Sequence, residues 1–392
     1  MFITARRLFD GRSPQVLADP VVEVADGRIV GVGQHGSPVS GPDVLDLGDV
    51  TLLPGLIDVH QHLAFDASSD PVARLQSDDD ATLLLRMRLA ACRALAAGIT
   101  TIRDLGDRNY LSLTLRDWFR GGGEIGPRII ASGPPITVTG GHCWFLGGEA
   151  DGAEGVRQAV RDRVVHGVDV IKIMVTGGNM TPTLGPRESQ YTCAEIAAVA
   201  GEAHAHGLRV AAHAHGGPGI ADAMRGGADS IEHCTFFSAA GVDADPRVIE
   251  ELARRQTAIS MTGGTLPGST PPYPAMRERL AAIIANHRVL YRAGARIVCG
   301  TDAGVGPNKP HDVLPHGVSG FLPAIGMTNA EALTAATAVA AGVCGLANTT
   351  GTLEVGKDAD MLAVAGNPLE DITAIHDVLA VFVRGARAPF SI

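Results

Sequence analysis

Long apolar runs, paired cysteines and basic clusters are all missing from this sequence of 392 residues. No apolar stretch approaches the roughly 20 residues of a transmembrane helix, and the segment MFITARRLFDGRSP lacks the apolar core of a signal peptide. The six cysteines form no Cys-x-x-Cys pair, as is typical of reduced thiols. The formal net charge is −10 and the positive residues are scattered, so no basic stripe is available for nucleic acid. We therefore expect a cytoplasmic protein with a small-molecule substrate and neither membrane nor nucleic acid as a partner.

Hydrophobic residues make up 45% of the chain and charged residues 19%, which is typical of a well-packed globular protein. Both ends read as short strands and turns, with PVVEVADGRIVGVG alternating around an Asp26-Gly27 turn and GTLEVGKDADMLAV repeating that style. Neither end is long enough to bury a sheet of its own. We expect residues 1–53 and 352–392 to pair into one small β-sandwich domain.

Between the two ends, the pattern alternates between strands and Ala-rich helical stretches that close in glycine. Eight βα units predict an α/β fold, a (β/α)8 TIM barrel over residues 54–351, with a doubly wound sheet as the alternative. The strand segments are 55–60, 98–105, 127–133, 168–175, 208–214, 228–234, 257–262 and 295–302.

Pairs of histidines one residue apart occur three times, and chance alone produces some of them. His60 and His62 end an apolar strand, where residues i and i+2 point to the same side and can hold a cation between them. His204 and His206 lie on a helix at a spacing that shares no face, so we expect surface residues. His215 lies past the end of its strand and is a lesser candidate than His213.

Chemistry in such a barrel sits at the carboxyl ends of the strands, and residues that can bind metal recur there. Their convergence on one mouth is stronger evidence than any single His-x-His pair. The six candidate ligands are His60, His62, Lys172, His213, His233 and Asp302.

Lys172 lies between Ile171 and Ile173 in a segment that reads as a buried strand. A free ammonium is costly there. One alternative is an ion pair with a buried carboxylate. The other is an amine that has reacted with carbon dioxide, since desolvation lowers the amine pKa and favours a carbamate.

These motifs resemble the amidohydrolase superfamily of metal-dependent hydrolases, through PGLIDVHQH, VIKI, VAAHAHG, SIEHC and CGTDAG. Within it, the sequence is most similar to the binuclear prolidase-like, or Xaa-Pro dipeptidase-like, group, which includes ochratoxin-type amidases. The resemblance implies that His60 and His62 bind one metal and that His213 and His233 bind the other. It also implies a carbamylated Lys172 that bridges two divalent ions, expected to be zinc.

The resemblance also implies that Asp302 ligates the first metal and serves as general base and acid. His142 and Tyr191, in loops after predicted strands, are candidate donors to the substrate carbonyl. Each can equally be an ordinary loop or packing residue. Further candidates for substrate contact are Arg187, which could hold a carboxylate or be solvated, His316 and Tyr273.

The leading hypothesis is an amidohydrolase that cleaves a peptide-like C–N bond in a dipeptide or an N-acyl amino acid. Alternatives on the same scaffold are a hydrolase of a cyclic amide, lactone or imidazolone, and an enzyme of natural-product tailoring or detoxification. A scaffold that has lost catalysis would lack ligands, whereas all six positions are filled here. Relatives of this type often assemble, so a homo-oligomer is expected.

Overall fold

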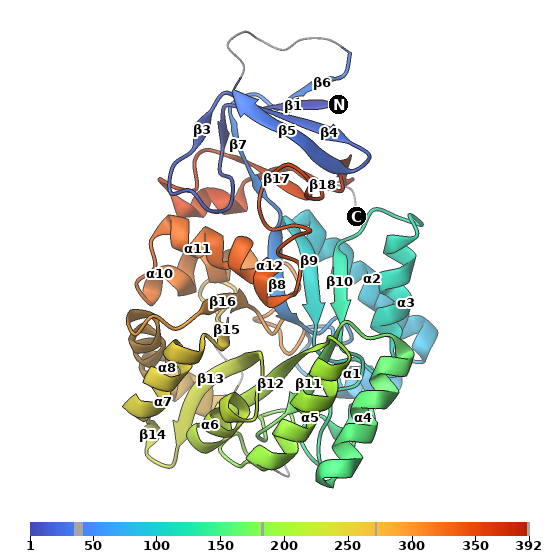
Figure 1. Ribbon diagram of the computed structural model, residues 1–392, viewed down its shortest axis with the longest axis vertical. Coiled ribbons are helices and arrows are strands. Elements are labelled where there is room, and N and C mark those ends of the chain that lie inside the picture. The colour runs from blue at the N-terminus through green and yellow to red at the C-terminus, as the bar shows by residue number, and fades with distance from the viewer. Residues whose placement is uncertain (35–41, 182–183, 271–272, 390–392) are drawn as a thin grey trace.

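Eight parallel strands form the centre of the computed structural model, which describes residues 1–34, 42–181, 184–270 and 273–389 (Figure 1). They lie in two sheets, in the orders β10-β9-β8 and β11-β12-β13-β15-β16. Every one overlaps a segment predicted from the sequence. The bounds are β8 (Leu56–Gln61), β9 (Ile99–Asp104), β10 (Arg128–Ala131), β11 (Val170–Met174), β12 (Arg209–Gly216), β13 (Ser230–Ser238), β15 (Ala258–Thr262) and β16 (Ile297–Gly300).

The two parallel sheets meet along both sides. Ile136, beyond the end of β10, bridges to Ile173 of β11, and Gln61 of β8 bridges to Ala303 beyond β16. The backbone N–H of Asp302 also donates to the His60 carbonyl at 2.7 Å. These contacts bring the ends of β8 and β16, which carry candidate ligands, against each other.

Helices connect successive strands and cover the outside of the sheets (Figure 1). Their ends follow the local sequence: a capping box between Thr192 and Glu195 starts α5, and Gly167 ends α4 in the left-handed conformation. The helices are α1 (Pro71–Ser77), α2 (Asp80–Ala96), α3 (Leu111–Arg120), α4 (Gly152–His166), α5 (Cys193–Ala205), α6 (Gly217–Arg225), α7 (Pro246–Arg255), α8 (Pro274–Arg292), α9 (Leu314–His316), α10 (Leu322–Ala324), α11 (Asn329–Ala335) and α12 (Ala338–Val343), with shorter turns η1 (Trp144–Leu146), η2 (Gly317–Phe321) and η3 (Ile372–His376).

Strands from the two chain ends form two further sheets, which lie together at the top of Figure 1 in blue and red. The first has the order β5-β4-β1-β6 and the second β19-β18-β17-β7-β2-β3. Side chains of both sheets, such as Ile3, Val22, Leu52 and Phe382, share one buried apolar cluster. The bounds are β1 (Phe2–Thr4), β2 (Arg7–Leu8), β3 (Leu17–Ala18), β4 (Pro20–Ala25), β5 (Arg28–Gln34), β6 (Val44–Asp46), β7 (Val50–Pro54), β17 (Met361–Ala365), β18 (Val378–Val383) and β19 (Ala386–Arg387), while a two-residue strand β14 (Gly241–Val242) pairs with β13.

Charged side chains are buried among the parallel strands, and they set up the site. Arg103 on β9 and Lys172 on β11 are among the largest fully buried side chains of the described residues. A buried charge is costly unless it is paired or bound to an ion. The groups that surround these two side chains therefore indicate where the functional site lies.

Within the described part of the chain, no helix is both long and apolar enough to cross a membrane. The cytoplasmic location and the homo-oligomer expected from the sequence stay predictions.

Candidate metal centre

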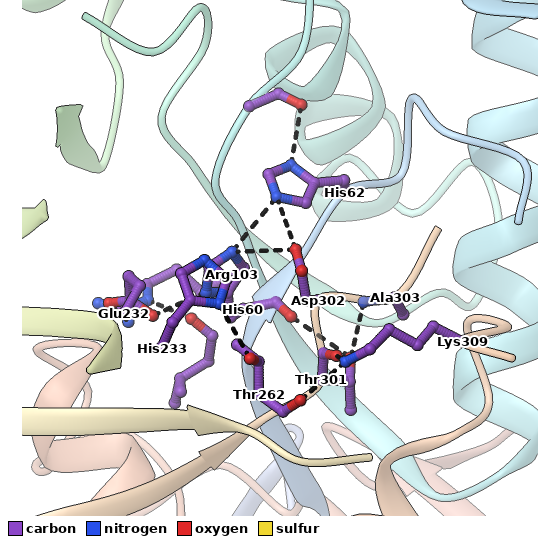
Figure 2. A network of polar contacts seen from close by, with 12 residues as sticks. His60, His62, Arg103, Glu232, His233, Thr262, Thr301, Asp302, Ala303 and Lys309 are labelled. Atoms are coloured by element: carbon purple, nitrogen blue, oxygen red, sulfur yellow. Dashed lines mark hydrogen bonds and ion pairs between the residues drawn. The ribbon is translucent and has the colours of Figure 1, made fainter. Parts of the chain in front are cut away.

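Three predicted ligands meet where β8 and β16 end (Figure 2). The Nε2 atoms of His60 and His62 are 3.3 Å apart. Oδ1 of Asp302 lies 3.4 Å from Nε2 of His60 and 3.3 Å from Nε2 of His62. All three side chains therefore present a ligand atom to one point, as the alternation of side chains along a strand predicts for the two histidines.

The backbone of this group is fixed by Asp58, which is buried on β8. Its carboxylate accepts from the N–H groups of His60 and Thr301 and from the Thr301 hydroxyl at 2.6 Å. Burial raises the pKa of Asp58 to about 6, although these hydrogen bonds oppose the shift. Asp302 has a φ of 61°, an uncommon value for a residue with a side chain, of the kind that concentrates at functional sites.

Glu232 of β13 orients His60 from behind. Its Oε2 accepts from Nδ1 of His60 at 2.8 Å, which leaves Nε2 free to bind a metal. Its Oε1 accepts from Nη2 of Arg103 at 2.8 Å and from the Ser230 hydroxyl at 2.6 Å. Burial would raise the pKa of Glu232, but Arg103 and His60 hold it well below its usual value.

Sequence reasoning missed the Glu232–Arg103 pair. The signal was present, because SIEHC places an acidic residue and TTIRDL a basic residue in segments that read as buried strands. A buried acidic residue and a buried basic residue in the same core are expected to form an ion pair.

The second group contains His213, His215 and His233, whose ligand atoms lie within 4.8 Å of one another. The His213 ring donates from Nε2 to the Gly177 carbonyl at 3.0 Å, and Nδ1 of His233 contacts the Thr262 hydroxyl at 2.9 Å. His215, a lesser candidate in the sequence, is as close to the group as the other two. The ring centroids of His60 and His233 are 5.1 Å apart, so the two groups adjoin.

Lys172 lines the same cavity and is 1% exposed. In the described residues its Nζ has no hydrogen-bond partner, and no carboxylate lies within ion-pair distance of it. The alternative of a direct ion pair is therefore wrong for this structure. Burial lowers the pKa of Lys172 to about 8, against the opposing pull of Glu232 and Asp302.

The pKa shifts of several histidines and of Asp302 favour the protonation states that bind metal. Burial lowers the pKa of His60 and of His215 to about 4, and that of His213 well below the usual value. These imidazoles are neutral at pH 7, which is the form that binds metal. Burial would raise the pKa of Asp302, but His62 and His60 hold it below its ordinary value, so the carboxylate is ionised.

A cavity of about 520 Å³ opens over both groups, and three of the predicted substrate residues line it. They are His142, Tyr273 and His316. His142 is 5% exposed, and its ring centroid is 4.7 Å from that of His213.

Tyr191 and Arg187 do not line the cavity. Tyr191 is packed into the apolar core, and its hydroxyl donates to the Ala150 carbonyl at 2.7 Å. A hydroxyl held in this way does not reach the ligands, so the structure corrects the prediction of a donor at Tyr191. Arg187 is exposed, which corrects the prediction of a carboxylate fork in the site and agrees with the solvated alternative.

The donor set fits two divalent cations. Each group supplies at least three ligand atoms, and the same cavity holds the buried Lys172 amine, which has no hydrogen-bond partner in the described part of the chain. Imidazole nitrogen and carboxylate oxygen suit zinc and related transition metals.

Neutral imidazoles and an ionised carboxylate at the carboxyl ends of parallel strands are typical of metal-dependent hydrolases. The model of the Amidohydrolase family matches residues 51–387. The chain therefore belongs to the amidohydrolase family and is a hydrolase that acts on C–N bonds.

Several known proteins are similar to this chain. Ochratoxinase of Aspergillus niger is 30% identical over 84% of the chain and 73% of its own length. Imidazolonepropionase of Deinococcus radiodurans is 26% identical over 95% of the chain and 92% of its length. The crystal structure of a Xaa-Pro dipeptidase with methionine in its active site is 30% identical, covers 98% of both chains and superposes with a TM-score of 0.86.

Proposed function

We propose that this protein is a binuclear metal-dependent hydrolase that cleaves an amide bond in a small substrate. His60, His62 and Asp302 would hold one divalent ion, most consistent with zinc. His213 and His233 would hold the second, with His215 beside it. The observation that carries the proposal is the pair of ligand groups facing one cavity that also holds a buried lysine, whose amine has no partner among the described residues.

Lys172 is proposed to serve as an anionic ligand shared by both ions. Its amine nitrogen bonds to the carbon of carbon dioxide and loses one proton, which gives a carbamate. A pKa lowered to about 8 leaves a fraction of the amine unprotonated near neutral pH. Carbamylation also explains why an uncompensated amine is placed among neutral imidazoles.

The strand arrangement supports a closed (β/α)8 TIM barrel over residues 54–351. The bridges Ile136–Ile173 and Gln61–Ala303 join the two parallel sheets at both sides. Residues 1–53 and 352–392 are proposed to form the composite β-sandwich domain, since their two sheets share one apolar cluster. The site would then lie at the carboxyl mouth of the barrel.

Bound divalent ions would supply polarisation of the substrate carbonyl and activation of a water molecule. Asp302, ionised and in contact with His60 and His62, takes a proton from the attacking water and delivers it to the leaving nitrogen. His142 faces the cavity as a neutral ring, since burial lowers its pKa to about 3, and can donate to the carbonyl oxygen as negative charge develops there.

Dipeptides, N-acyl amino acids and cyclic amides or lactones all present a suitable carbonyl. The relatives span this range by name, from a dipeptidase to an imidazolonepropionase. The chemistry of the ligand groups does not choose among these substrates. Selection among them depends on the side chains that form the walls of the cavity.

Removal of metal should abolish hydrolysis of amides. Chelator-treated protein is incubated with pools of N-acyl amino acids, their amides, dipeptides and lactams, and products are read by mass spectrometry. We expect amide cleavage by protein loaded with zinc and bicarbonate, none by the chelated protein, and recovery when zinc returns. Full activity after chelation, with metal absent by elemental analysis, would contradict the proposal.

A further inference from the structure

Helix α8 presents an apolar face to the cavity. Met276, Leu280, Ile283 and Ile284 all line it, at the i, i+4, i+7 and i+8 spacing that shares one side of a helix. In contrast, Val289 points away from this face and is 50% exposed. One helical stripe thus lines the cavity, and Ile284 of this stripe also packs against the protein core.

The remaining wall continues this apolar surface. Leu266 and Pro267, which follow β15, line the cavity together with Phe321 of η2. Phe65, after β8, lies beside the first ligand group, with its ring centroid 5.5 Å from that of His62. The cavity therefore has a polar end at the metal ligands and an apolar end large enough for an aryl or branched alkyl group.

Charged side chains are few in this cavity. Of the described residues that line it, only Lys172, Lys309 and Asp302 are of the lysine, arginine, aspartate or glutamate types. Lys172 and Asp302 belong to the proposed metal centre. Lys309 donates to the carbonyls of Thr262 and Thr301, at 2.7 and 2.5 Å, and so ties together the ends of β15 and β16 (Figure 2).

Among the described lining residues, a substrate carboxylate at the apolar end would consequently have no dedicated counter-ion. Arginine, the usual clamp for a carboxylate, is absent from the described lining residues. Burying an unpaired carboxylate is far more costly than burying a neutral group.

Asn308 supplies a neutral alternative. It is 5% exposed and lines the cavity, and neither its Nδ2 nor its Oδ1 has a hydrogen-bond partner in the described residues. Its backbone carbonyl accepts from Leu266 at 2.9 Å, which holds the loop in place. An unsatisfied carboxamide both donates and accepts, which is the complement of an amide group.

We infer, resting on the proposed function, that the substrate is a neutral amide with a bulky apolar group. The apolar group packs on the α8 face, and the Asn308 carboxamide pairs with a neutral polar group of the substrate. Short peptides and N-acyl amino acids with a free carboxylate are then poor substrates.

The first test compares N-(2-naphthoyl)-leucine N-methylamide with N-(2-naphthoyl)-leucine, which differ only at the terminal group, a neutral N-methylamide in one and a carboxylate in the other. Release of naphthoate by the metal-loaded protein is followed by mass spectrometry. We expect kcat/KM at least about tenfold higher for the methylamide, the effect of one unpaired buried polar group. Equal or faster cleavage of the free acid would overturn the inference.

The second test uses a matched pair of variants on one helix. Leu280→Asn lies on the cavity face and Val289→Asn on the opposite side, and both positions are already partly exposed, at 38% and 50%. We expect Leu280→Asn to raise KM at least about fivefold for the naphthoyl methylamide and less than twofold for its acetyl counterpart, in proportion to the apolar area lost. Val289→Asn should change neither. Asn308→Ala should raise KM for the methylamide about threefold to tenfold.

The results separate this inference from the proposed function. Cleavage of small acidic N-acyl amino acids in preference to the naphthoyl methylamide would agree with the proposed amide hydrolase. It would contradict the inference of a neutral, apolar substrate. Absence of any amide cleavage, with two metals bound per chain, would contradict the proposed function itself. Identical kinetics in Leu280→Asn and Val289→Asn would also overturn the apolar site on α8.

Discussion

Asp302→Asn is expected to lower kcat for amide hydrolysis by about 10²–10⁴-fold, the range of a positioned general acid or base. An amide retains the size of the side chain and an oxygen that can ligate, but it cannot accept the proton. The folded carboxylate is ionised at neutral pH because His62 and His60 hold its pKa below the ordinary value. The basic form is therefore present throughout the neutral range in the native protein and absent from the variant.

The measurement is single-substrate kinetics with the metal content and the circular dichroism of each sample. Asp312→Asn is the matched control, because Asp312 lies in the same loop, pairs with Arg93 at 2.9 Å and does not line the cavity. We expect the control to retain its kcat. A loss in Asp302→Asn confined to KM, or no loss with metal still bound, would remove Asp302 from proton transfer.

Glu232→Gln is expected to lower the free energy of unfolding by about 3–5 kcal/mol, the cost of breaking a buried ion pair by removing one partner. The substitution leaves the Arg103 guanidinium, which remains charged, in a core where its Nη2 has lost an anionic acceptor. The same change weakens the orientation of His60, so metal affinity should fall about 10–100-fold.

The unfolding measurement is made in urea with chelator present, so that lost metal binding does not enter the result. Glu251→Gln removes a surface carboxylate paired with Arg225 and Arg255, and we expect only a small change from it. The double variant Arg103→Met with Glu232→Gln should be less destabilised than Glu232→Gln alone, since no unpaired charge remains. A double variant at least as unstable as the sum of the single variants would show that the pair is not coupled.

Strand positions were predictable because the chain alternates apolar strands with Ala-rich helices, and the two periodicities are visible in sequence. The same pattern put His60, His62 and Asp302 at strand ends, where the structure finds them converging. Residues two apart at the end of a strand share a side, which is a local property.

Two of the misses, at Tyr191 and at Glu232, concern contacts between distant segments. Tyr191 follows the loop after β11, which is a position expected for a donor to the substrate. Its hydroxyl instead donates to the Ala150 carbonyl, a contact that residue spacing does not predict. His215 lies beside His213 because β12 continues to Gly216, past the strand end expected from the sequence, and residues two apart on a strand share a side. Pairing of Glu232 with Arg103 joins residues 129 positions apart.

The most direct test of the binuclear site is the number of divalent ions per chain, measured by inductively coupled plasma mass spectrometry on wild type and on Lys172→Ala. Both are loaded with zinc and bicarbonate and desalted. The account predicts two ions per wild-type chain and one or none in Lys172→Ala, because the alanine cannot form the shared carbamate. Two ions retained by Lys172→Ala, or one in the wild type, would contradict it.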